Sequence, residues 1–195
     1  MSSGVFATRD ASGIVFNRMK ELLHTSVLVG IPAEHNGREE TGGAQTPGNA
    51  ALLYIHEFGS PAANIPARPT LIPGVRKAEH RTIPALKAAA RAALEGNDAK
   101  AKTELNRAGA IAVASVRNEI MFGDFVPLSP KTVANRWRHR PGAEDVSSRR
   151  PGERQYLAML AQGVPPEEAQ VAAGIHPLIN TSQMLNAVTY VVKED

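Results

Sequence analysis

Hydrophobic and polar residues alternate with helical spacing in three long stretches of the chain. The first, SGIVFNRMKELLHT, begins with Ser12 as its N-cap. The second covers residues 75–95 and contains Pro84, where we expect a bend. The third covers residues 99–122 and follows Asp98 as its N-cap. Its apolar positions recur every three or four residues and predict one buried stripe, formed by Leu105, Ala108, Ala112, Val116 and Ile120.

Two short runs have the composition of β-strands instead. Residues 26–31 read SVLVGI and are stopped by Pro32, and residues 189–192 read TYVV. We expect these two runs to share one sheet. The predicted fold class is therefore α+β, with helices packed on a small mixed or antiparallel sheet.

A shorter helix, NAALLYIHEFG, lies between a polar loop and a proline-rich segment. We expect Asn49 to be its N-cap and Gly59 to end it. The loop, residues 33–49, is rich in glycine, and residues 60–74 hold prolines that favour an extended, semi-rigid chain. On this helix Ala51, Ile55 and Phe58 lie on one face, and Leu52 joins the edge of that face.

The C-terminal half begins with a helix that Ser129 caps and in which Pro130 occupies the first position. A charged connector and two short helices follow, RQYLAMLAQGV and PPEEAQVAAG. We interpret residues 1–195 as a single domain with a basic, mostly helical insertion at about 129–176. A capped helical turn from Thr181 then leads into the last strand.

Composition narrows the class of protein. Hydrophobic residues make up 43% of the 195 residues, but aromatic residues make up only 5%. Because alanine buries little area, we expect a modest core that gains stability from assembly with other copies. The chain has no cysteine, which excludes a disulfide framework, a cysteine-ligated zinc and a thiol nucleophile. We find no signal peptide and no apolar run long enough to span a bilayer.

The adjacent pair His56-Glu57 is the strongest hint of chemistry, and it is weak. The zinc-protease pattern His-Glu-x-x-His needs a second histidine where this chain has Ser60. The spacing of His35, His80 and His176 gives no sign that they converge on a metal. No nucleophile elbow and no glycine-rich phosphate loop occurs. We therefore expect a protein that is not an enzyme and has no cofactor, in which Glu57 caps a helix or pairs with Arg68.

A basic window from Lys131 to Arg154 holds seven basic residues against three acidic ones, a formal charge of +4. The whole chain carries only +3. The window is interpreted either as a solvated loop or as a surface for phosphate or an acidic partner. Its tryptophan predicts an anchor for a partner subunit or a stacking platform for a base. The candidate partner- or DNA-facing residues are Arg136, Trp137, Arg138, Arg140, Arg149 and Arg150.

Several motifs together resemble those of tailed-bacteriophage neck and tail-completion proteins. That family includes the virion morphogenesis proteins of Mu-like phages and the minor tail proteins of lambda-like phages. The motifs appear in the family's order as VLVGIP at 27–32, YIHEFGS at 54–60, IPARPTLIP at 65–73, PLSPKTVANR at 127–136 and PLINTSQMLNAVTYVV at 177–192. Two positions depart from the family's pattern: Thr70 stands in place of an aromatic residue, and Ser182 in place of a glycine.

The resemblance implies a structural virion protein at the junction of head and tail, made in the bacterial cytoplasm of the host. It implies a ring, hexamer or dodecamer, between a portal, adaptor or head-closure protein and the tail tube or terminator protein. Double-stranded DNA would pass through the channel with weak, non-specific contact, and no membrane is involved. Alternatives are a tail terminator and a nucleic-acid-binding module using residues 131–154. The implied interface or structural residues are His56, Glu57, Phe58, Gly59, Ile65, Pro66, Arg68, Pro69, Pro73, Thr181 and Tyr190.

Overall fold

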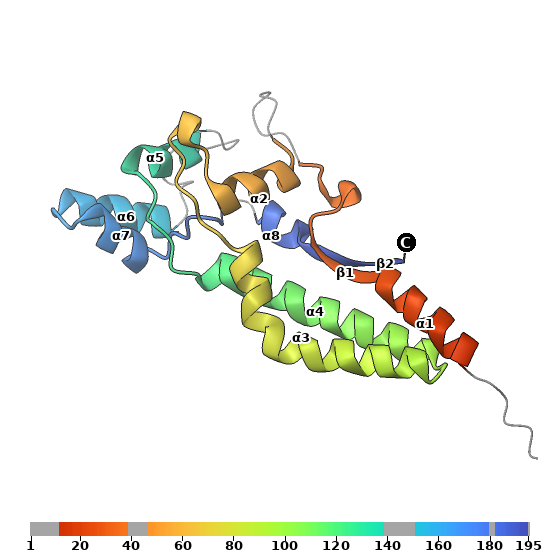
Figure 1. Cartoon of the computed structure of the whole chain (residues 1–195). Coiled ribbons are helices and arrows are strands. Elements are labelled where there is room, and N and C mark those ends of the chain that lie inside the picture. Colours follow the sequence, from red (N-terminus) through yellow and green to blue (C-terminus); the bar gives the residue numbers. More distant parts are fainter. Residues whose placement is uncertain (1–11, 39–46, 139–150, 180–181, 195) are drawn as a thin grey trace, which may run out of the picture.

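The computed structural model describes residues 12–38, 47–138, 151–179 and 182–194. Within them, the α-helices are α1 (Ser12–His24), α2 (Asn49–Phe58), α3 (Leu71–Leu94), α4 (Asp98–Phe122), α5 (Pro130–Arg138), α6 (Pro151–Ala161), α7 (Pro166–Ala172) and α8 (Gln183–Ala187). The strands are β1 (Thr25–Gly30) and β2 (Thr189–Glu194). Figure 1 shows α3 and α4 as a long hairpin beneath the sheet, with α5–α7 at one end of the molecule and α1 at the other.

The two strands form one antiparallel sheet, as the sequence predicted. Their register pairs Thr25 with Glu194 and Gly30 with Thr189. One face of the sheet packs on α4 through side chains such as Val29 and Tyr190, which join the main core. The fold is therefore α+β, with helices packed on a small antiparallel sheet.

The α3–α4 hairpin is built from small residues. Ala85, Ala89 and Ala92 of α3 are almost fully buried. The predicted stripe of α4 is confirmed: Ala108, Ala112, Val116 and Ile120 are buried, and Leu105 is half-buried. Small side chains let the two helix axes approach closely, so each residue removes little area from water but makes many van der Waals contacts.

Hydrophobic residues gather in two clusters. The main core joins α2, α4, α8 and the sheet and contains Leu53, Val113, Val116, Ile120, Leu178, Met184 and Val188. A smaller cluster in the α5–α7 region contains Leu128, Val133, Tyr156 and Ala169. Gln170 connects this region to the preceding chain, because its side chain bonds both the N–H and the carbonyl of Leu128.

Helix starts differ from the sequence prediction in three places. α3 begins at Leu71 rather than near residue 75, and Pro73 lies inside its first turn. The cap of α4 is Asn97, whose Oδ1 accepts from the Lys100 N–H at 3.0 Å, and the predicted Asp98 is the first helical residue. α1 begins at Ser12 itself. Ser129 does cap α5 as predicted, since its Oγ accepts from the Thr132 N–H at 3.2 Å.

The buried face of α2 is not the face that carries Ala51 and Phe58, and the prediction that Asn49 caps this helix was wrong. Its buried residues are Asn49, Leu53 and Glu57, whereas Ala51 and Phe58 are exposed. Asn49 does not cap the helix: its side chain bonds the carbonyls of His35 and Gly37. The cap is supplied by Asn36, whose Oδ1 accepts from the Ala50 N–H at 2.8 Å. Polar residues lie inside because they bond the backbone of neighbouring segments.

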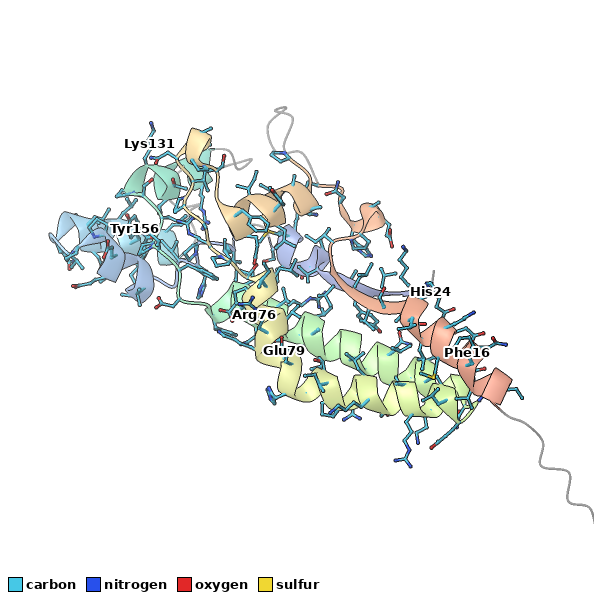
Figure 2. The ribbon with its side chains drawn as sticks, in the orientation of Figure 1. Phe16, His24, Arg76, Glu79, Lys131 and Tyr156 are labelled. Carbon is cyan, nitrogen blue, oxygen red and sulfur yellow. The ribbon has the colours of Figure 1, made fainter. Side chains whose placement is uncertain are left out.

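The apolar side of α1 is largely in water. Leu23 is 83% exposed and Phe16 is 58% exposed, and Ile14, Val15 and Met19 are also exposed. Figure 2 shows Phe16 on α1, at the end of the molecule far from Lys131 of α5. The helix is held to the hairpin by Arg18, which donates to the carbonyls of Ala93 and Leu94 at 3.3 and 3.1 Å. Among the described residues, no helix has the length and apolar character needed to cross a membrane.

Candidate functional site

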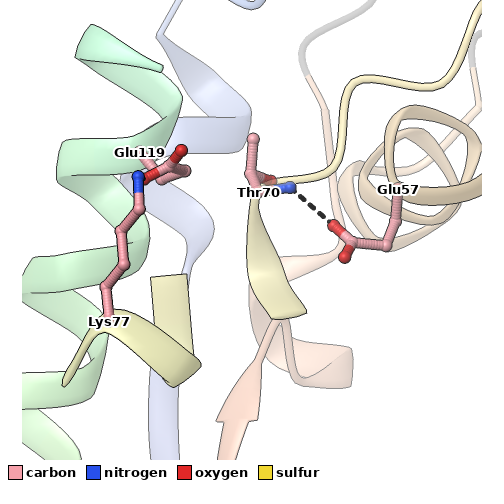
Figure 3. A network of polar contacts seen from close by, with 4 residues as sticks. All are labelled: Glu57, Thr70, Lys77 and Glu119. Atoms are coloured by element: carbon pink, nitrogen blue, oxygen red, sulfur yellow. Dashed lines mark hydrogen bonds and ion pairs between the residues drawn. The ribbon is translucent and has the colours of Figure 1, made fainter. Parts of the chain in front are cut away.

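Glu57, a residue of helix α2, caps the N-terminus of helix α3. Its carboxylate accepts the N–H group of Thr70 at 2.7 Å (Figure 3). It also accepts the N–H groups of Leu71 at 2.8 Å and Ile72 at 3.0 Å. The next residue, Pro73, has no N–H, and the Gly74 N–H donates to the Thr70 carbonyl at 3.0 Å. Every N–H of the first turn is thus satisfied, and the negative charge lies at the positive end of the helix dipole. The predicted capping role of Glu57 is confirmed, and its alternative pairing with Arg68 is wrong.

The chain turns sharply at Gly59 to bring this carboxylate to α3. Gly59 has φ +77, and an added Cβ would lie 3.0 Å from the Ala67 nitrogen and from the Ile65 oxygen. Ser60 and Ile65 pair in an isolated antiparallel bridge, and the Arg68 N–H donates to the His56 carbonyl at 2.6 Å. Only glycine fits this left-handed turn and its close backbone contacts.

The prediction of an extended proline segment over residues 60–74 was wrong at both ends, because Pro61–Ala63 form a 3₁₀-helix and α3 begins at Leu71. Pro66 and Pro69 are exposed, whereas Arg68 and Thr70 are buried. Arg68 is only 5% exposed, and its guanidinium donates to the carbonyls of Val126 at 3.0 Å and Pro127 at 3.3 Å. Burial lowers the pKa of this guanidinium from its ordinary value. Arg68 therefore fastens the motif to the chain that leads into α5.

Four of the five sequence motifs meet around one pocket of about 510 Å³. It lies between α2, the extended segment, the start of α5 and the chain around α8. Its polar or charged lining includes Arg38, His56, Asn64, Arg68, Ser129, Thr132, Arg136, Ser182 and Gln183. Its apolar lining includes Leu52, Ile65, Leu178 and Met184.

His56 is neutral in this pocket. Burial, together with the charges of Arg68 and Arg136, lowers the pKa of its imidazole to about 4. Its Nδ1 is buried without a hydrogen-bond partner among the described residues. The imidazole therefore offers a neutral donor or acceptor and not a positive charge.

Among the predicted partner-facing residues, Arg136 is the one whose side-chain position the structure describes. Its guanidinium donates to the carbonyls of His176, Pro177 and Ile179, and so holds the chain before α8 against α5. Trp137 and Arg138 belong to α5, but the positions of their side chains lie outside the described part of the structure. Arg140, Arg149 and Arg150 lie outside the described residues altogether, as does Thr181.

Tyr190 and Phe58, the aromatic residues among the predicted interface residues, occupy opposite environments. The Tyr190 ring lies against Gly109 of α4 so closely that a Cβ at that glycine would overlap it, and its hydroxyl donates to Asn106 Oδ1 at 3.1 Å. Phe58 is 59% exposed and lies beside the exposed Tyr54, with 4.8 Å between ring centroids. Tyr190 is therefore a packing residue, and the Tyr54–Phe58 pair presents apolar surface.

Four pocket or support residues were not singled out from the sequence. Arg38 and Asn36 lie in a polar loop that has no helical or strand periodicity, so no pattern marked them. Gln170 and Gln183 lie in short helices and look like ordinary surface residues. Arg38 and Asn36 form hydrogen bonds to Asn49 and Ala50 at the start of α2, and these contacts exist only in the folded chain.

Ser182 has a backbone conformation that usually favours glycine. It has φ +60, in the left-handed region that glycine adopts without strain. We expect Ser182→Gly to raise the free energy of unfolding by about 0.5–1 kcal/mol, measured by urea denaturation. Asn64→Gly is the matched control, because Asn64 has φ +53 but asparagine tolerates this region better. A loss of stability in Ser182→Gly, or a larger gain in Asn64→Gly, would contradict the strain at Ser182.

Among the described residues, no group of three histidine, aspartate or glutamate side chains is placed to hold a metal. Ser60, which stands where the zinc-protease pattern needs its second histidine, lies in the bridge with Ile65. Comparison with protein-family models, with curated proteins and with solved structures gave no significant match for this chain. Interpretation of the site therefore depends on its own geometry and on the motifs of the sequence.

Proposed function

We propose that this chain is a non-enzymatic assembly protein at the head–tail junction of a tailed bacteriophage, required for joining the tail to the capsid. The observation that carries the proposal is the uncovered apolar side of α1, where Phe16 and Leu23 are mostly in water. A lone soluble chain gains nothing from such a surface, whereas an assembling subunit buries it against a neighbour.

The roles of the motif residues support an architectural function. Glu57 caps α3, Gly59 makes the turn, Arg68 fastens the segment before α5, and Tyr190 packs on α4. Each of these residues holds one part of the chain to another. In an assembly protein, such bonds fix the edges that neighbouring subunits recognise.

The order of the sequence motifs supports a position for the proposed assembly between head and tail. We propose a ring of identical subunits, with a portal, adaptor or head-closure protein on one side and tail tube or terminator protein on the other. The protein would be made in the cytoplasm of the host bacterium and would become part of the virion. The exposed Tyr54 and Phe58 of α2 form a second apolar surface, which would contact one of these neighbouring proteins.

The test changes α1 without touching the core. In the double variant Phe16→Asp/Leu23→Asp, two exposed apolar side chains become charged, so the monomer should keep its melting temperature. We expect sedimentation of the purified protein to show loss of self-association. We also expect complementation of a phage that lacks the gene to give unjoined capsids and tails in negative-stain micrographs.

Asn17→Asp is the matched control, because it places the same aspartate on an exposed position of the same helix. It should support joined particles. Normal numbers of joined, infectious particles with the double variant would overturn the proposal.

A further inference from the structure

Three arginines contribute to the described lining of the pocket between α2 and α5. Arg38, Arg68 and Arg136 are part of its lining, and the described lining includes no aspartate or glutamate. Burial is the main cause of the lowered pKa of His56, and the positive charges of Arg68 and Arg136 lower it further. An anionic group entering the pocket would meet a favourable potential.

Two of these arginines have no carboxylate partner among the residues that the structure describes. Arg68 donates only to two backbone carbonyls, and Arg38 donates to the amide oxygen of Asn49 at 3.0 Å. No carboxylate among the described residues forms an ion pair with either side chain. Arg68 is nine-tenths buried, and a buried charge is normally paired. A carboxylate delivered from outside would supply the missing partner.

The pocket also offers uncharged polar atoms. His56 Nδ1 and Gln183 Oε1 are both buried and have no hydrogen-bond partner within the part of the chain that the structure describes. Both residues belong to the lining. Unsatisfied buried polar atoms are rare in native proteins, so a ligand that bonds them would remove a cost that the free protein bears.

The remaining lining is apolar and selects the class of ligand. Leu52, Ile65, Leu178 and Met184, with prolines 66, 127 and 177, cover much of the pocket wall. A peptide can place an acidic side chain near the arginines and an apolar side chain on this wall. The backbone of duplex DNA presents phosphates and sugars, which gain little from an apolar recess and are usually bound across a broad basic surface.

We propose that this pocket binds an acidic segment of another protein. An aspartate or glutamate carboxylate of that segment would lie beside Arg38 and Arg68, and a neighbouring apolar side chain would pack on the pocket wall that contains Leu52 and Leu178. The proposal goes beyond the assembly role and does not depend on it, because it concerns binding of a peptide by the isolated protein. It assigns to the motif residues a recognition surface in addition to their structural bonds.

The binding test uses two synthetic peptides with the full-length chain. The probe is acetyl-Leu-Glu-Ile-Glu-amide, and the matched control is acetyl-Leu-Gln-Ile-Gln-amide, which has nearly the same shape without the charges. We expect the acidic peptide to bind about tenfold more tightly, and to lose that advantage as salt is raised. In NMR spectra it should shift the His56 imidazole signals, while those of exposed His80 stay in place.

Two protein variants test the location. Thr132 lines the pocket at the third position of α5, and Thr132→Glu would place a carboxylate there while completing a capping box with Ser129. The variant should therefore fold normally and bind the acidic peptide at least about tenfold more weakly. Lys131→Glu is the control: it reverses a full charge one residue away, outside the lining, and should leave binding almost unchanged.

Three results would overturn the proposal. The first is equal binding of the two peptides, and the second is equal weakening by Thr132→Glu and Lys131→Glu. The third is displacement of the bound acidic peptide by a short DNA duplex that shifts the same His56 signals, which would assign the pocket to phosphate. Normal assembly by the α1 double variant would overturn the assembly proposal and leave the peptide result untouched, so the two proposals fail separately.

Discussion

Replacing Glu57 with alanine should lower the free energy of unfolding by about 3 kcal/mol, the largest loss that we expect from a single polar substitution in this chain. The carboxylate accepts three N–H groups at the start of α3, two of them at 2.8 Å or less. Removing it leaves these donors without partners in a largely dry site, and it removes a negative charge from the end of the helix dipole. Urea or thermal denaturation followed by circular dichroism measures the loss.

Two further variants test whether the lost helix cap causes the lower stability of Glu57→Ala. Glu57→Gln keeps one acceptor oxygen but presents an amide N–H₂ to other donors, so its loss should be intermediate. Glu79→Ala removes an exposed carboxylate from the same helix and should change stability by less than about 0.5 kcal/mol. Figure 2 shows Glu79 on the outer side of α3. Equal losses for Glu57→Ala and Glu79→Ala would show that the cap contributes nothing.

Replacing Gly74 with alanine should have the second large effect, a loss of about 1–3 kcal/mol. Gly74 is buried in α3, and an added Cβ would lie 2.7 Å from the Val116 Cα and 2.9 Å from its Cγ2. The contact is with backbone, so relief requires that α3 and α4 move apart along the alanine-lined hairpin. That movement would weaken the packing of several small side chains at once.

The control for Gly74 is Gly13, a helical glycine of α1 with nothing within 4 Å of an added Cβ. Gly13→Ala should leave stability unchanged or raise it by about 0.5 kcal/mol, because alanine favours helix. The two variants make the same chemical change and differ only in the space available. A stability gain in Gly74→Ala would mean that the helices are not in close contact at that point.

The fold class and most elements followed from the sequence because periodic burial leaves a periodic pattern. The stripe of α4, the pairing of the two strands and the capping of α5 by Ser129 were all predicted. The start of α3 was not, because prolines at 69 and 73 suggest extended chain unless the partner of the free N–H groups is known. That partner, Glu57, lies in another helix.

The candidate site could be predicted from the sequence even less completely than the helix starts. The motifs identified His56, Arg68 and Arg136 as important, but their spacing contained no information on the pocket that they line together. The buried face of α2 could not be predicted from hydrophobicity, because Asn49 and Glu57 are polar residues that are buried to bond the backbone of other segments. Arg38 lay in a loop without any periodic signal.

The single antiparallel sheet has a consequence for how the chain folds. Its two strands come from opposite ends of the sequence, and the register runs from Thr25 with Glu194 to Gly30 with Thr189. The α3–α4 hairpin is local and can form early, whereas strand pairing must wait until residues 189–194 have been synthesised. During translation β1 is therefore an unpaired strand with both edges open, so a chain arrested before β2 should be prone to aggregation.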